Sequence, residues 1–133
     1  MDTGAWLAII DPKDRYHQLA SDFHRQAVME RVQFITTNLV IAESYTLIGR
    51  RLGHQKAIRF LDLVNVALRL RKIQSAPDLE KIAEDILRKY DDQELSYVDA
   101  VSFAAMTDQG LQVAFAFDHH FEMMGFIRQP YEG

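Results

Sequence analysis

Carboxylates stand in this sequence at positions where apolar side chains are expected. Asp118 ends the apolar run "VAFAFD", which has the composition of a strand buried on both faces. Glu43 lies four residues from both Leu39 and Leu47 in "NLVIAESYTLI", too deep in the expected helix to cap it. A salt bridge from Glu43 to Arg50 is the structural alternative, but seven residues span two helical turns and exceed its comfortable reach.

Two further acids have a structural explanation beside a chemical one. Asp99 in "SYVDAVSFAAM" lies four residues before Phe103, on the same helical face, so its side chain points toward the apolar side. Ser96 and Asp99 also fit a capping box, in which both residues only begin a helix, and the sequence leaves these two roles of Asp99 open. Asp2 precedes the apolar segment "TGAWLAII", and an acid at the N-terminus is normally just solvated.

A cation is required if Asp2, Glu43, Asp99 and Asp118 converge, because neighbouring negative charges repel one another. Oxygen ligands hold the hard ions Mg²⁺ and Mn²⁺. The chain has no cysteine and no tight histidine pair at helical spacing, so zinc is the poorer choice. The four acids therefore predict a site for Mg²⁺ or Mn²⁺.

Other polar groups receive a structural interpretation first. His119 and His120 follow Asp118 directly, but adjacent residues of a turning chain diverge, so at most one is expected to face the pocket and a solvated loop is favoured. Basic residues gather in the middle of the chain, where a solvated face is the usual explanation and RNA phosphates or an acidic partner are the functional one. They are Arg50, Arg51, Lys56, Arg59, Arg69, Arg71 and Lys72.

Length and composition limit the class of protein. A chain of 133 residues predicts one domain, residues 1–133, and 48% hydrophobic with 26% charged residues is typical of a folded globular protein. The net charge of -4 argues against a passive nucleic-acid coat. No apolar stretch approaches the roughly 20 residues of a membrane span, and no signal peptide is recognisable, so we expect a cytoplasmic protein with no membrane contact.

Short apolar strands alternate with helical patterns along the chain. Helices are expected at 12–30, 38–52, 54–70, 77–90 and 96–110, and strands at 32–37, 71–76 and 112–117. Asn38 is the expected N-cap of its helix, and Gly53 and Gly110 are expected to end helices. Alternation of this kind predicts an α/β fold, a parallel sheet sandwiched by helices on both faces. Ligands bind beyond the carboxyl ends of such strands, which is where Asp118 lies.

The whole chain resembles a PIN domain nuclease of the VapC toxin type. The segments "DTGAW", "TTNLVIAES", "LSYVDAVSFA" and "FAFDHHF" followed by "GF" resemble, in this order, the four motifs that carry the acids of that family. The resemblance implies a three-layer α/β/α fold and an acidic pocket with one or two Mg²⁺ or Mn²⁺ ions. It also implies hydrolysis of RNA phosphodiester bonds, for which metal ions activate water and stabilise the growing phosphoryl charge.

The resemblance also assigns roles to residues and implies partners. Asp2, Glu43, Asp99 and Asp118 match the acidic residues, and Thr3 and Ser96 match hydroxyl positions that support the pocket. An RNA substrate, an antitoxin protein and a homodimer are the partners it implies. Apolar helical positions available for the dimer contact are Phe60, Leu61, Val64 and Leu68, and a place in the core explains the same residues equally.

The chain departs from the family pattern at three places. Only Met1 precedes Asp2, where the family has a short central strand, so that strand is expected to be missing or to begin before Met1. Gly4 replaces a serine, and Ala116 stands where a threonine or serine is common, which is expected to weaken support of the metal ligands. The alternatives are a catalytically degenerate PIN fold that serves as an interaction module, and a phosphorylation-dependent receiver, which would need a lysine after its last strand.

Overall fold

The computed structural model describes residues 1–132, which form seven helices and four strands. The helices are α1 (Thr3–Ile10), α2 (His17–Met29), α3 (Asn38–Leu52), α4 (His54–Val66), α5 (Pro77–Lys89), α6 (Tyr97–Asp108) and α7 (His120–Met123). The strands are β1 (Phe34–Thr37), β2 (Leu70–Ile73), β3 (Val113–Phe115) and β4 (Ile127–Gln129). No helix among these residues is both long and apolar enough to cross a membrane.

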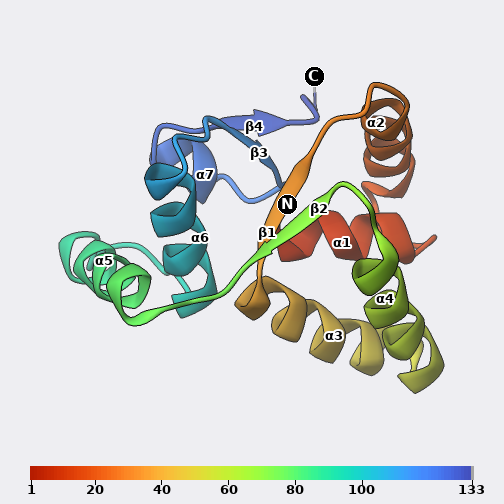
Figure 1. Ribbon diagram of the computed structural model, residues 1–133, viewed down its shortest axis with the longest axis horizontal. Coiled ribbons are helices and arrows are strands. Elements are labelled where there is room, and N and C mark those ends of the chain that lie inside the picture. Colours follow the sequence, from red (N-terminus) through yellow and green to blue (C-terminus); the bar gives the residue numbers. More distant parts are fainter. Residues whose placement is uncertain (133) are drawn as a thin grey trace.

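All strand pairs are parallel. Phe34 of β1 is in register with Leu70 of β2, and Val113 of β3 with Ile127 of β4. The strands lie in the middle of the molecule, with α5 and α6 on one side and α1, α2 and α4 on the other (Figure 1). The predicted α/β fold, parallel strands between helical layers, is confirmed, with the strands divided into two pairs.

The start of α3 differs from the prediction by one residue. Thr37, not Asn38, is the N-cap, because its backbone is extended and its hydroxyl accepts a hydrogen bond from the Val40 N–H at 3.1 Å. Asn38 instead accepts a hydrogen bond from the backbone N–H of Ser75 at 2.8 Å. The side chain of Asn38 therefore ties the first turn of α3 to the segment that follows β2.

The ends of α2 and β3 also differ from the prediction. α2 begins at His17 rather than at residue 12, because Asp11 and Asp14 accept hydrogen bonds from backbone N–H groups two residues on and hold turns there. β3 ends at Phe115, two residues early. Neither α7 nor β4 was expected, since elements of three or four residues are too short to show a period.

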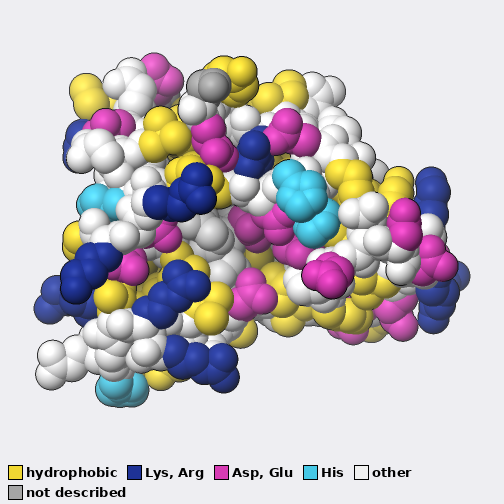
Figure 2. Space-filling model, turned by 180° about the vertical axis from the view of Figure 1, so that it is seen from behind, with side chains coloured by type: hydrophobic (Ala, Val, Ile, Leu, Met, Phe, Trp, Pro, Cys, Tyr) yellow, Lys and Arg dark blue, Asp and Glu magenta, His cyan; other side chains and the backbone are white. Residues whose placement is uncertain are grey.

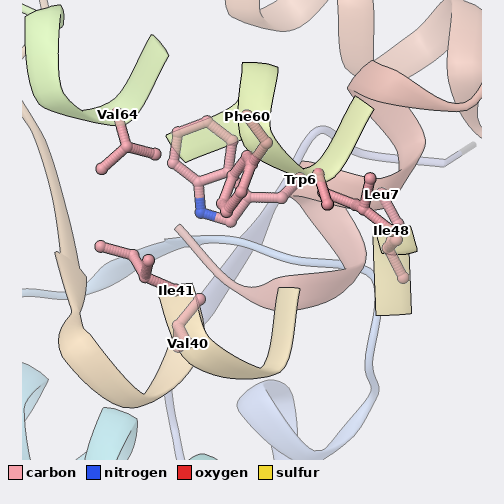
Figure 3. Close-up of a cluster of buried hydrophobic side chains, with 8 residues drawn as sticks. Trp6, Leu7, Val40, Ile41, Ile48, Phe60 and Val64 are labelled. Carbon is pink, nitrogen blue, oxygen red and sulfur yellow. The ribbon is translucent and has the colours of Figure 1, made fainter. Parts of the chain in front are cut away.

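A core of apolar side chains joins α1, α3 and α4 (Figure 3). Trp6 and Phe60 meet edge to face with ring centroids 5.2 Å apart, and both are buried. Val64 is also buried in this core. The core role of Phe60 and Val64 is therefore confirmed and their use as a dimer contact is wrong, because their side chains point into the protein.

The first two residues bridge the two strand pairs. The Met1 amino group donates to the Ile35 carbonyl at 2.8 Å, and the Asp2 N–H donates to the Phe115 carbonyl at 3.0 Å. Burial lowers the pKa of the Met1 amino group to about 6, against the opposing charge of Asp2. Behind Met1 lies a cavity of about 440 Å³, lined along its length by residues 32–37 and 110–115. The cavity thus lies between the inner edges of β1 and β3.

We expect an apolar extension before Met1 to stabilise the protein. Four β-branched residues added there would enter the cavity as a strand, pair with β1 and β3, and replace the buried amino group by a peptide N–H. Burial of an apolar side chain contributes about 1.5–3 kcal/mol of stability, which exceeds the conformational entropy lost by ordering the backbone, about 1–2 kcal/mol per residue. A rise in Tm of roughly 5 °C or more by calorimetry is the expected result. A Gly-Ser extension of equal length is the control, and equal Tm values would contradict the expectation.

Candidate metal centre

The turn that follows β3 is held by hydrogen bonds at both ends of Asp118. Its Oδ1 accepts from the backbone N–H of His120 at 2.9 Å. Before it, the Phe117 carbonyl accepts a hydrogen bond from Arg128 of β4, which also pairs with Glu122 at 2.6 Å. Arg128 is a residue that sequence reasoning missed, because only the pairing of β4 with β3 brings it to this turn.

Only one of the two histidines beside Asp118 is solvated as predicted. His119 is a solvated residue, with 76% of its side chain exposed, but the side chain of His120 is only 12% exposed. The Nδ1 atoms of both rings lie near Asp118 Oδ1, at 3.6 Å for His119 and 2.9 Å for His120. The expectation that adjacent side chains diverge here is wrong, because the chain turns into α7 and folds both rings back.

Asp99 has the capping role that the sequence left open, and the charges of other acids act on it as well. The capping box is present, since the Ser96 N–H donates to Asp99 Oδ2 at 3.2 Å and the Asp99 N–H donates to Ser96 Oγ at 3.0 Å. Burial raises the pKa of Asp99, the Ser96 hydrogen bonds oppose this, and the charges of Asp118 and Glu43 raise it further. Asp99 therefore begins α6 and also lies in the field of two other acids.

Asp2 is the most buried of the acids. It is 8% exposed, and its Oδ1 is enclosed by protein and has no hydrogen-bond partner. Burial is the largest cause that raises the pKa of Asp2 to about 6, followed by the charge of Asp99, with Glu43 adding a smaller effect. The Thr3 N–H and the amino terminus oppose this rise. A buried carboxylate oxygen without a partner is costly unless something positive meets it.

The side chain of Glu43 is half-buried on α3, and its charge raises the pKa values of Asp2 and Asp99. Among residues 1–132, no ion pair joins it to Arg50, so the structural alternative is not realised. Ser44 beside it is fully buried, and its hydroxyl has no partner. Sequence reasoning missed Ser44, although a polar residue between Ile41 and Ile48 at helical spacing was a usable signal.

Charge effects thus link four acids from distant parts of the sequence. They are Asp2 before α1, Glu43 on α3, Asp99 at the start of α6 and Asp118 after β3. Acidic side chains gather near a hollow in the middle of one face, with histidine beside them (Figure 2). The residues fit a hard divalent cation, because all four offer carboxylate oxygens, one of them buried and unpaired. Of the two supporting hydroxyls, Ser96 caps α6, while Thr3 Oγ1 is buried without a partner.

Parallel strands between helices, with acids from four segments of the chain, define a class of acidic-site α/β proteins. Residues 1–127 match the PIN domain family, and the chain belongs to this family. Membership excludes the receiver alternative.

The chain is similar to a curated protein, the 23S rRNA-specific endonuclease VapC20, from two strains of Mycobacterium tuberculosis. Each is 34% identical over 128 residues, which cover 96% of this chain and 94% of the relative. The crystal structure of Mycobacterium tuberculosis VapC20, described as a sarcin-ricin loop cleaving toxin, superposes with a TM-score of 0.83. That match has 33% sequence identity and covers 95% of this chain and 94% of the other.

Proposed function

We propose that this protein is a metal-dependent endoribonuclease and the toxin of a toxin-antitoxin pair. The observation that carries the proposal is the mutual charge effect among Asp2, Glu43, Asp99 and Asp118, which raises the pKa values of Asp2 and Asp99. Similarity to an endonuclease over nearly the whole chain supports the same activity. The degenerate interaction module is the alternative, and the experiment below separates the two.

Some residues of the proposed site would bind the metal ion, and others hold these ligands in position. We propose that the four carboxylates are the ligands of Mg²⁺ or Mn²⁺ and that no acid acts as a nucleophile. When bound, such an ion lowers the pKa of water and offsets charge on the phosphoryl oxygens. The capping box of Ser96 orients Asp99, Arg128 fixes the carbonyl before Asp118, and the backbone N–H of Thr3 donates a hydrogen bond to Asp2. Groups held in this way need no reorganisation during the reaction.

Ribosomal RNA is the substrate that we propose, specifically the sarcin-ricin loop of 23S rRNA, as the name and description of the relatives suggest. This substrate places the activity in the cytoplasm. A basic surface supports RNA binding: residues 44–77 contain seven lysine and arginine residues and one acid, although the whole chain carries -4. All seven are exposed, and Lys and Arg gather over α3 and α4 (Figure 2).

The purified protein is expected to cut an RNA hairpin with the sarcin-ricin sequence when Mn²⁺ or Mg²⁺ is present and to stop when EDTA is added. Product length on a denaturing gel locates the cut, and a hairpin with a scrambled loop is the control for sequence preference. Cleavage of neither hairpin nor of total ribosomal RNA with either ion would favour the degenerate interaction module.

A homodimer and an antitoxin are the protein partners that we propose. With Phe60 and Val64 in the core, the contact would use the exposed face of α4 and the segment that follows it. Leu63 is 54%, Val66 70% and Leu68 100% exposed. Light scattering is expected to give twice the chain mass of 15.4 kDa. Changing both Leu63 and Val66 to Asp should yield a monomer.

The control for that experiment is Val28→Asp, an exposed apolar position on α2 outside the proposed contact. It should leave the mass unchanged. A parent protein that stays monomeric at millimolar concentration would rule the dimer out.

A further inference from the structure

Three side chains of metal-binding type meet at the turn between β3 and α7. Asp118 Oδ1 lies 2.9 Å from His120 Nδ1 and 3.6 Å from His119 Nδ1, and one ligand atom from each residue lies within 4.8 Å of the others. The two rings are tilted by 35° with centroids 4.3 Å apart. This cluster adds two nitrogen donors to one of the four acids described above.

Hydrogen bonding does not account for the buried nitrogen. His120 Nδ1 is closed to solvent and is not aligned for a hydrogen bond, although the Asp118 oxygen is only 2.9 Å away. That oxygen already accepts the backbone N–H of His120. A buried polar atom left unsatisfied costs about 1–3 kcal/mol, so a partner for this nitrogen would stabilise the turn.

A single carboxylate oxygen cannot serve every donor around it. Asp118 Oδ1 already accepts the backbone N–H of His120, and the Nδ1 atoms of two rings whose centroids are 4.3 Å apart lie near the same oxygen. A cation between the three groups would meet the carboxylate and both ring nitrogens at once.

The separations suit direct coordination. Zn²⁺ binds nitrogen and oxygen at about 2.0–2.2 Å, which places neighbouring ligand atoms about 3.0–3.5 Å apart in octahedral or tetrahedral geometry. The observed 2.9 and 3.6 Å bracket this range. His119, with 76% of its side chain exposed, is free to adjust, whereas His120 is already held by packing.

We propose that Asp118, His119 and His120 bind a transition-metal ion of the Zn²⁺ or Co²⁺ type, distinct in its ligands from the four-carboxylate site for Mg²⁺ or Mn²⁺. Imidazole nitrogen suits zinc, cobalt and nickel, while Mg²⁺ prefers oxygen alone. Because Asp118 belongs to both sets, an ion held by the histidines withdraws one carboxylate from the proposed catalytic centre. The cluster thereby couples the proposed ribonuclease to the availability of transition metals, a step that rests on the proposed function.

The test uses Co²⁺ titrated into untagged protein without RNA, followed by visible absorption. A d–d band that saturates at one equivalent and that excess Mg²⁺ does not remove is expected. His120→Ala and His119→Ala should each weaken Co²⁺ binding at least about tenfold. His54→Ala, which removes an exposed histidine at the start of α4, is the matched control and should bind Co²⁺ as the parent does.

The result separates this proposal from the proposed function. A parent that cleaves RNA but gives no histidine-dependent Co²⁺ band overturns the metal site and leaves the ribonuclease intact. A histidine-dependent band in a protein that cleaves no RNA supports the site and overturns the ribonuclease. Equal loss of Co²⁺ binding in His54→Ala and His120→Ala would show nonspecific histidine binding and overturn the site.

Discussion

Asp118→Asn is expected to reduce metal-dependent RNA cleavage by at least about 100-fold, the cost typical of removing one preorganised electrostatic group. The change removes one negative ligand of the proposed metal centre. The amide oxygen can still accept the N–H of His120 that Asp118 Oδ1 accepts at 2.9 Å, so the turn should keep its shape. Initial rates on a radiolabelled RNA hairpin, with Mn²⁺ in excess, measure the effect.

The thermal stability of Asp118→Asn, unlike its cleavage rate, is not expected to fall. The charge of Asp118 is one of the causes that raise the pKa of Asp99, so neutralising it relieves repulsion and should leave Tm in metal-free buffer equal or higher. Asp91→Asn, the same change at an exposed turn residue, is the matched control for both measurements. A well-folded Asp118→Asn protein that cleaves at the parent rate would refute the role assigned here. Lost stability in Asp118→Asn with no activity in the parent would indicate a purely structural residue.

Mn²⁺ at a concentration one hundred times its Kd is expected to raise Tm by on the order of 10 °C. An ion that binds only the native state then adds about 2.7 kcal/mol to the free energy of unfolding. Part of the gain is relief of repulsion among the four carboxylates. Asp2 has a pKa of about 6 in the folded protein, above its ordinary value, so its ionised form lowers stability above that pH. Differential scanning calorimetry at pH 7.5, with and without EDTA, should therefore show the full shift.

Two variants distinguish the proposed role of Asp99 as a metal ligand from its role as a helix cap. Asp99→Asn can keep the hydrogen bond from the Ser96 N–H and should abolish most of the Mn²⁺ shift, because only the charge is lost. Ser96→Ala removes the hydroxyl of the capping box, so the free energy of unfolding should fall by about 1 kcal/mol. Most of the Mn²⁺ shift in Tm should remain. An unchanged shift in Asp99→Asn would return Asp99 to the capping role alone.

Local signals in the sequence were sufficient for much of the fold. The capping box at Ser96 and the proline at the start of α5 are short-range features, and the structure has both where they were expected. Gly53, with a φ of 97°, ends α3 as predicted, since this backbone conformation strains other residues. The parallel α/β class followed from alternating apolar segments, which report burial without reference to contacts.

Tertiary contacts decided what these signals could not. Whether Phe60 faces a partner or the core depends on Trp6, fifty-four residues away, and the choice of Thr37 over Asn38 as N-cap depends on Ser75. The sequence pointed to the four acids only because carboxylates stand where apolar or solvated residues are expected. Their mutual charge effects, the unpaired oxygen of Asp2 and the turn of His120 toward Asp118 arise from packing between segments far apart in the chain. Desolvation and Coulomb interactions depend on distances in space, which no local pattern specifies.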